Sequence, residues 1–120
     1  MEDFKKNWTE VEQMLNQKFG KIPNLEAILF LVGIQESGQL RRKFTKEQKQ
    51  DLMHVAVCAL LSKSGYYFLE SHDSDGWPHY TELMPVPPMN MEQQENFLKT
   101  HIIDYFREDN HIASLEPTDK

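Results

Sequence analysis

The stretch LEAILFLVGI, residues 25–34, decides the fold, because Glu26 is its one strongly polar residue. It is far shorter than the ~20 apolar residues that a membrane span needs. Its length, together with the stop signal at Gly38, favours a helix over a strand. A helix that is apolar on nearly every side must be surrounded by its own fold or by a second subunit. We therefore expect this helix at the centre of the core.

Apolar residues before this stretch recur at spacings of three and four, which is typical of one face of a helix. The stripe consists of Phe4, Trp8, Val11, Leu15 and Phe19. It predicts a helix over residues 3–19, followed by Gly20, which can adopt the left-handed conformation that ends a helix.

Capping-box patterns predict where two further helices begin, at about 46–63 and 91–108. In this pattern, two side chains at the start of a helix bond to each other's backbone N–H groups. The pairs are Thr45 with Gln48 and Asn90 with Gln93. Both predicted helices carry apolar residues at helical spacing, so each has a face to bury.

Aromatic and apolar runs flank the sequence DSDG at 73–76, and this arrangement predicts a β-hairpin at about 66–84. The prolines that follow impose an extended connector to the last helix. The sequence therefore predicts a mainly α fold: a compact four-helix bundle-like domain over residues 1–110, with the short β-hairpin between the third and fourth helices. Residues 111–120 are polar, and we expect a flexible tail there.

Composition and cysteine content limit the class of protein. The chain has 120 residues, of which 39% are hydrophobic and 27% charged, and a formal net charge of −6. These values exclude collagen-like, low-complexity and disordered proteins. The single cysteine, Cys58, excludes an internal disulfide framework. With no secretory signal at the N-terminus, an unpaired thiol predicts a cytoplasmic protein that does not enter a membrane.

Charge is distributed unevenly along the chain. Residues 1–50 hold nine Lys/Arg against seven Asp/Glu, and residues 51–120 hold four against twelve. The acidic second half would repel phosphate, which argues against general nucleic-acid binding. A local exception is the basic cluster of Arg41, Arg42, Lys43, Lys46 and Lys49. We interpret it as a solvated loop and first helical turn, with a phosphate or RNA contact as the alternative.

The hairpin turn carries the densest group of polar, titratable and aromatic side chains outside the apolar helices. The group consists of His72, Asp73, Asp75, Trp77 and His79. An indole beside a proline in a loop usually needs a surface to cover. We therefore predict a binding surface here, with an ordinary exposed hairpin tip as the alternative.

The same segment, counted as a twelve-residue loop from Ser71 to Glu82, resembles the calcium loop of the EF-hand family. Asp73, Asp75 and Gly76 occupy its third, fifth and sixth positions. The first position is a serine instead of an aspartate, and a proline-rich stretch replaces the outgoing helix. We favour a hairpin turn whose acids cap backbone N–H groups.

Two carboxylate–imidazole pairs lie at helical spacing on the third and fourth predicted helices: Asp51 with His54, and His101 with Asp104. These pairs resemble half of the Glu-x-x-His arrangement of di-metal helical bundles. Glu36 adds a third carboxylate, and the resemblance implies a divalent metal ion. Without a metal, each histidine is simply held by a nearby acid, which is the interpretation we favour.

His54 and Cys58 are one helical turn apart, a spacing at which an imidazole can activate a thiol. The sequence around Cys58 is VAVCALL, residues 55–61, where a thiol behaves as a small hydrophobic side chain. We therefore expect Cys58 to contribute to the core and identify no catalytic residue.

These observations lead to one principal hypothesis and one alternative. The principal hypothesis is a non-catalytic protein-interaction module that forms a homodimer and needs no cofactor, because the 25–34 helix calls for more cover than four helices provide. The alternative is a metal-binding protein or metal-dependent enzyme that uses the His/Asp pairs.

Overall fold

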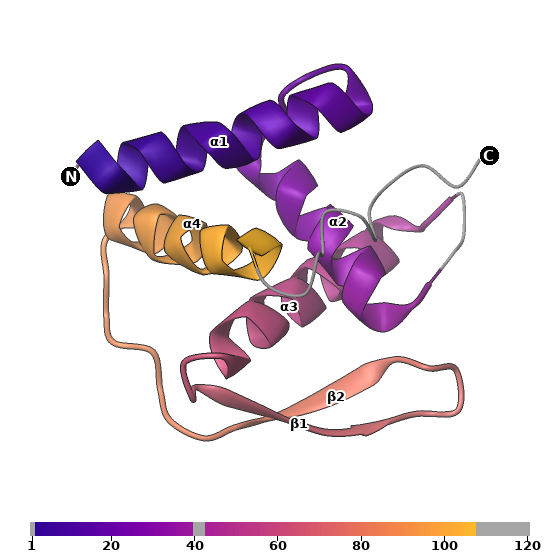
Figure 1. Cartoon of the computed structure of the whole chain (residues 1–120). Helices are drawn as coiled ribbons and strands as arrows, with labels where there is room; N and C mark the ends of the chain where they lie inside the picture. Colours follow the sequence, from indigo (N-terminus) through magenta and orange to yellow (C-terminus); the bar gives the residue numbers. More distant parts are fainter. Residues whose placement is uncertain (1, 40–42, 108–120) are drawn as a thin grey trace. The chain divides into compact units, whose positions relative to one another are not determined.

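The computed structural model describes residues 2–39 and 43–107 (Figure 1). These residues form four helices and one antiparallel hairpin, which lies between the third and fourth helices, so the predicted mainly α fold is confirmed. The elements are α1 (Glu2–Phe19), α2 (Leu25–Ser37), α3 (Lys46–Ser62), β1 (Tyr67–His72), β2 (Pro78–Glu82) and α4 (Met91–Arg107). No helix in the described ranges has the length and apolar character to cross a membrane.

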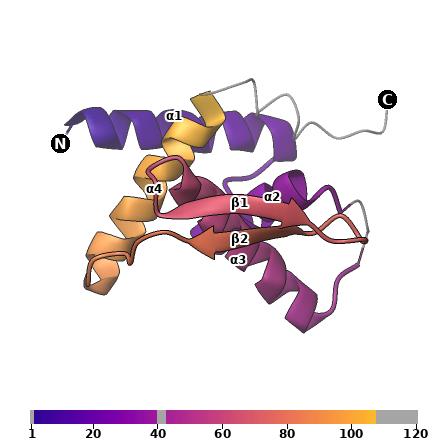
Figure 2. The same ribbon diagram turned by 90° about the horizontal axis from the view of Figure 1, so that it is seen from below.

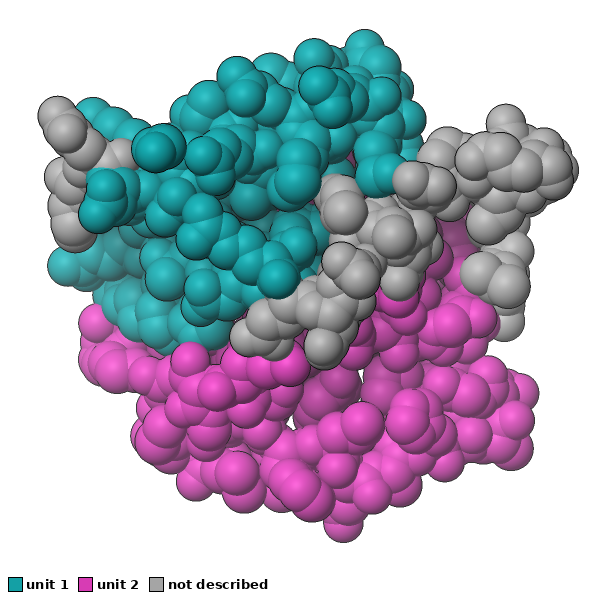
Figure 3. All heavy atoms as spheres, in the orientation of Figure 1, with its two compact units in different colours: residues 1–24, 89–120 teal, residues 25–88 magenta. Residues whose placement is uncertain are grey.

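Internal contacts divide the chain into two compact units, coloured separately in Figure 3. The central unit spans residues 25–88, and the terminal unit joins residues 1–24 to residues 89–120. The single domain predicted over 1–110 stays a prediction. The predicted tail at 111–120 lies outside the described residues.

In the central unit, α2 and α3 approach each other backbone to backbone. The contact is made by Gly33, because a Cβ atom added there would lie 2.0 Å from the carbonyl oxygen of Leu52. Glycine inside a helix costs about 0.5–1 kcal/mol relative to alanine. Here it allows two helices to come closer than any side chain between them would permit.

Close packing also accounts for the burial of α2, which is a helix as predicted. Ile28 and Val32 are completely buried, and Glu26 is the one exposed residue between Leu25 and Ser37. The apolar positions of this helix are therefore buried or half-buried within a single chain.

Both predicted capping pairs form. The Thr45 hydroxyl accepts the Gln48 N–H at 3.0 Å, while the Thr45 N–H donates to the Gln48 side chain at 2.9 Å. Asn90 and Gln93 make the same reciprocal pair, at 2.8 and 3.0 Å. Each pair satisfies N–H groups that the first turn of a helix leaves without intrahelical partners, so α3 and α4 begin where the sequence predicts.

The hairpin lies along one side of α3, as Figures 1 and 2 show from two directions. Tyr67 pairs with Glu82 and Phe68 with Thr81, and an irregularity in register falls between Leu69 and Ser71. Its turn is closed by Gly76, whose φ of +90° is readily adopted only by glycine.

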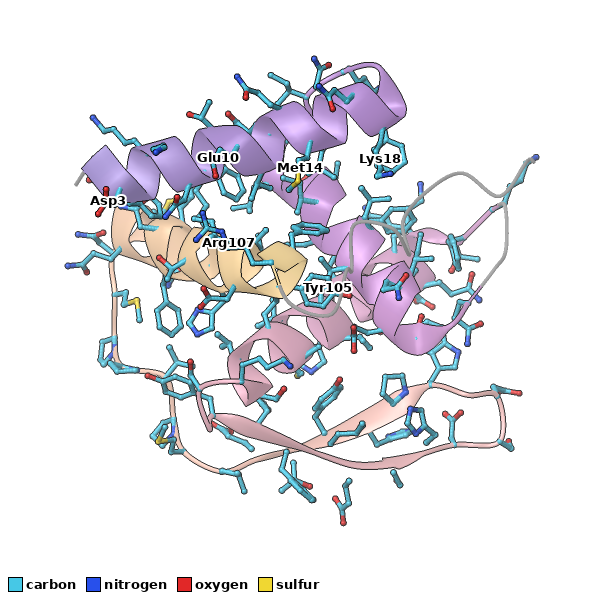
Figure 4. All side chains as sticks on the ribbon, viewed as in Figure 1. Asp3, Glu10, Met14, Lys18, Tyr105 and Arg107 are labelled. Carbon is cyan, nitrogen blue, oxygen red and sulfur yellow. The ribbon has the colours of Figure 1, made fainter. Side chains whose placement is uncertain are left out.

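In the terminal unit, α1 and α4 are joined by charged and aromatic contacts. Arg107 reaches from α4 toward α1 (Figure 4) and donates to Asn7 at 2.7 Å and to Glu10 at 3.3 Å. The Lys99 ammonium lies 5.1 Å from the centre of the Trp8 ring, within the range of a cation–π interaction. Side-chain contacts thus connect the first and the last helix of the described chain.

The predicted stripe on α1 is buried at its centre and exposed at its end. Trp8, Val11 and Leu15 are buried, whereas Phe19 is 37% exposed. Phe19 is the last residue of the helix, and Gly20 follows it with a φ of +81°. The last apolar position of the stripe therefore lies where the helix ends, and its side chain is exposed.

We expect Gly33→Ala to destabilise the protein by about 3 kcal/mol, because the added methyl group forces α2 and α3 apart. Urea unfolding followed by circular dichroism measures this loss. The matched control is Gly38→Ala, which meets no atom within 4 Å but has a φ of +69°. It should cost only ~1 kcal/mol, the price of a left-handed alanine. Equal losses in the two variants would contradict the close approach.

Candidate functional site

The central unit contains a pocket of about 440 Å³ between α3 and the hairpin. Among the described residues that line it there is no lysine or arginine. The lining combines carboxylates, imidazoles and aromatic rings: Asp51, His54, Val55, Cys58, Tyr67, Asp73, Trp77, Pro78, His79 and Tyr80. The pocket is therefore aromatic and acidic.

One wall of the pocket is held in shape by the carboxylate of Asp73. Its Oδ1 accepts the N–H groups of Asp75 at 2.9 Å and Trp77 at 3.0 Å, and its Oδ2 accepts from His79 Nε2 at 3.1 Å. The bond from His79, followed by that from Trp77, lowers the pKa of Asp73. This carboxylate therefore stays ionised and holds the backbone of Trp77 and the imidazole of His79 in place.

The same bonds account for the segment that resembles a calcium loop. Its residues are divided between the end of β1, the turn and the whole of β2. Both oxygens of Asp73 are occupied by protein donors. The favoured interpretation, a hairpin turn capped by an acid, is the one that the geometry supports.

The opposite wall comes from α3, where Asp51, His54, Val55 and Cys58 recur at spacings that place them on one face. His54 Nε2 lies 3.6 Å from Cys58 Sγ. The thiol is buried, with only 1% of Cys58 exposed. The two side chains are thus in contact, as a nucleophile and its base must be. The buried thiol, however, lacks the access to a substrate that a nucleophile needs.

The electrostatic surroundings keep this thiol protonated. Burial, and then the negative charge of Glu82, raise the pKa of Cys58 to about 11. A cysteine nucleophile needs the reverse, a pKa lowered by nearby positive charge. The burial expected for Cys58 is confirmed, and the environment opposes a catalytic role.

The two tyrosines respond to the same conditions. Burial, Glu36 and Cys58 raise the pKa of Tyr80 to about 12. Burial, Cys58 and Glu82 also raise the pKa of Tyr67. Carboxylates near the pocket therefore disfavour any further negative charge in it.

The structure brings part of the predicted binding surface into this pocket. Asp73, Trp77 and His79 line it, whereas His72 and Asp75 are exposed beside it. Sequence reasoning did not identify the two tyrosines as part of the site. The signal for Tyr67 was strand alternation, which places it on the opposite face of the hairpin from Phe68.

The five metal candidates are divided between the two units. Glu36, Asp51 and His54 belong to the central unit, and His101 and Asp104 to the terminal unit. Within the described ranges, no three His, Cys, Asp or Glu residues are grouped so that they could hold a metal ion. His101 is buried and donates from Nδ1 to the Phe97 carbonyl at 2.8 Å. Metal binding stays a prediction that elemental analysis of the purified protein tests.

The basic cluster is described only in part. Lys43, Lys46 and Lys49 are exposed, and Lys46 begins α3. Arg41 and Arg42 lie outside the described residues. The structure therefore supports solvated lysines at the start of α3.

A second pocket, of about 590 Å³, lies in the terminal unit. Its lining carries both signs of charge, with Lys5 and Arg107 against Glu92 and Asp104. Arg107 is already engaged by Asn7 and by Glu10 of α1. This pocket therefore carries both signs of charge, whereas the described lining of the first has no lysine or arginine.

No protein family, curated protein or solved structure matches the chain. The chemistry of the site therefore has to be read from its own atoms. Its ordered aromatic and acidic walls suit binding, and its one thiol is in the wrong protonation state for nucleophilic attack.

We expect Cys58 to react with iodoacetamide about 100-fold more slowly in the folded protein than in urea, since its pKa rises from 9.0 to about 11. The folded-state rate should increase with pH until about 11. A raised thiol pKa contributes stability below pH 9.0, and this contribution is lost as pH rises through about 11. Rapid alkylation that is independent of pH near neutrality would show an activated thiol instead.

Proposed function

We propose that this protein is a non-catalytic protein-interaction module that binds a partner through the outer face of its hairpin. The supporting observation is that two large apolar side chains stand in solvent there. Phe68 is 57% exposed and Leu83 is 60% exposed. Apolar groups gathered on one exposed surface are typical of interaction sites.

Strand geometry places these two side chains on the same face. Phe68 pairs with Thr81, and Leu83 follows two residues later along the chain. The backbone N–H of Leu83 donates to the Tyr66 carbonyl at 2.8 Å, which continues the pairing beyond β2. Side chains two residues apart in a strand point to the same side. Phe68 and Leu83 therefore form one surface, opposite the pocket wall that holds Tyr67.

The charge of the hairpin indicates the kind of partner. Residues 66–88 contain no lysine or arginine, and Glu70 lies on the outer face, since its carboxylate accepts a hydrogen bond from Thr81, which pairs with Phe68. A partner segment with positive charge and apolar side chains complements this surface. The two strands of the sheet also each have an outer edge, to which an extended segment of the partner can add.

A second copy of the chain is a less favourable occupant of this face. Two identical hairpins would bring their carboxylates together, and like charges directly opposite each other destabilise a sheet. The apolar positions of α2 are buried or half-buried within one chain, so they do not by themselves require a second copy. The homodimer nevertheless follows from the sequence argument and stays a prediction.

Light scattering coupled to size-exclusion chromatography at micromolar concentration measures the oligomeric state directly. The predicted homodimer has twice the 14.2 kDa mass of one chain. A species of 14.2 kDa would contradict the homodimer and leave the hairpin proposal intact, because that proposal requires only a basic partner.

The proposed setting is the cytoplasm, without nucleic acid as a partner. The free thiol of Cys58 is usual in a reducing compartment. The carboxylates of the hairpin would repel a phosphate backbone.

Selection from a random twelve-residue peptide library displayed on phage tests the interaction. We expect enriched peptides to be basic and to contain apolar residues. Phe68→Ser and Leu83→Ser should each weaken their binding at least ten-fold, and both variants should melt within about 3 °C of the parent, because the side chains are largely exposed. Lys63→Ser is the control on an exposed position outside the hairpin.

Two outcomes would overturn the proposal. One is a selection without enrichment over an empty support. The other is a set of enriched peptides that bind Phe68→Ser and Leu83→Ser as tightly as they bind the parent protein.

A further inference from the structure

The pocket between α3 and the hairpin lies on the side opposite the outer face, and the proposed interaction does not use it. Tyr67, Trp77 and Tyr80 supply aromatic rings to its lining. Asp51 and Asp73 supply two carboxylates, one from α3 and one from the hairpin turn. The two carboxylates therefore come from both walls, whereas the three rings all come from the hairpin.

We propose that this pocket binds an organic cation, an alkylammonium or guanidinium group, held between the aromatic rings and the carboxylates of Asp51 and Asp73. The π-face of an indole or phenol attracts a cation electrostatically, and the attraction is stronger where water is partly removed. The described lining has no Lys or Arg side chain that would already supply this positive charge.

The two carboxylates differ in how they are held. Asp73 is fixed by three hydrogen bonds, from the backbone N–H groups of Asp75 and Trp77 and from the His79 ring. Asp51 stands exposed on α3. Because its oxygens already accept from protein donors, Asp73 acts on a bound cation through its charge, whereas Asp51 can adjust to meet the cation directly.

The rest of the lining agrees with a positive ligand. The raised pKa values of Cys58 and Tyr80 are partly due to the negative charges of Glu82 and Glu36. Burial disfavours every charged form, but the negative charges of Glu82 and Glu36 favour a cation over an anion. A carboxylate or phosphate ligand would be repelled by these negative charges, and the described lining has no Lys or Arg side chain to offset the repulsion.

Size limits the ligand to a small group. A pocket of about 440 Å³ is within the range of small-molecule sites and has room for a lysine or arginine side chain or for a short free amine. A short alkylammonium ion with few contacts should bind with a Kd on the order of 1 mM.

Two-dimensional NMR of the full ¹⁵N-labelled chain tests the proposal, with the backbone amides of Gly76, His79 and Tyr80 as reporters. The probe is n-butylammonium at about pH 8, where histidine as a class is neutral. The neutral comparison is n-pentanol, which has a similar length. We expect saturable shifts with the ammonium and none with the alcohol.

Variants locate the binding. Trp77→Leu should weaken it at least five-fold by removing the indole face, and Asp51→Asn at least three-fold by removing a charge. Glu47→Gln is the matched control, since it removes one carboxylate from an exposed position in the first turn of α3 outside the pocket lining. Asp51 is also exposed, so Asp51→Asn stays informative if Trp77→Leu fails to fold.

A peptide arm distinguishes the source of the cation. If acetyl-Gly-Lys-Gly-amide binds more tightly than n-butylammonium, the natural ligand is a side chain of another protein; the reverse order indicates a free amine. Equal shifts with n-pentanol, no shifts up to about 20 mM, or an unchanged Kd in Asp51→Asn would overturn the proposal. None of these results bears on the outer face, which is tested by Phe68→Ser and Leu83→Ser.

Discussion

The close approach of α2 to α3 at Gly33 is the constraint on which the central unit depends. A glycine on one helix lies against the backbone carbonyl of Leu52 on the next, so the distance between the helices is set by main-chain atoms. Such a contact has little freedom to relax, because protein interiors are close-packed. The position of α3 is thereby fixed, and α3 supplies one whole wall of the pocket.

Asp51 stands next to Leu52 in sequence, so the turn of α3 that meets α2 also presents a carboxylate to the pocket. Across from it, Asp73 uses both oxygens to order a turn. Burial, followed by nearby negative charge, raises the pKa of Cys58 and of the two tyrosines and favours their neutral forms. These features favour recognition of positive charge and disfavour covalent catalysis.

Local signals in the sequence predicted the helices and the hairpin, because each is written in a few adjacent residues. Capping pairs such as Thr45 with Gln48 mark a helix start by chemistry that operates over three positions. The pocket was only half predicted, since the turn residues were identified and the tyrosines were not. Tyr80 reaches the pocket through a pairing across the hairpin, and its pKa depends partly on Glu36, which lies on α2. Neither relation can be seen in neighbouring residues of the sequence. The sequence around Gly33 likewise does not indicate that this residue lies against the carbonyl of Leu52.

The fastening of α1 to α4 has a consequence for how the protein is made. Arg107 bonds to Glu10 across 97 residues of sequence and to Asn7 across 100. During synthesis, α1 emerges first, yet the helix that it contacts leaves the ribosome only after the whole central unit. Throughout that interval α1 lacks the contacts that Asn7, Trp8 and Glu10 make with α4. Apolar surface that waits in this way for its last partner is what makes an unfinished chain prone to aggregation.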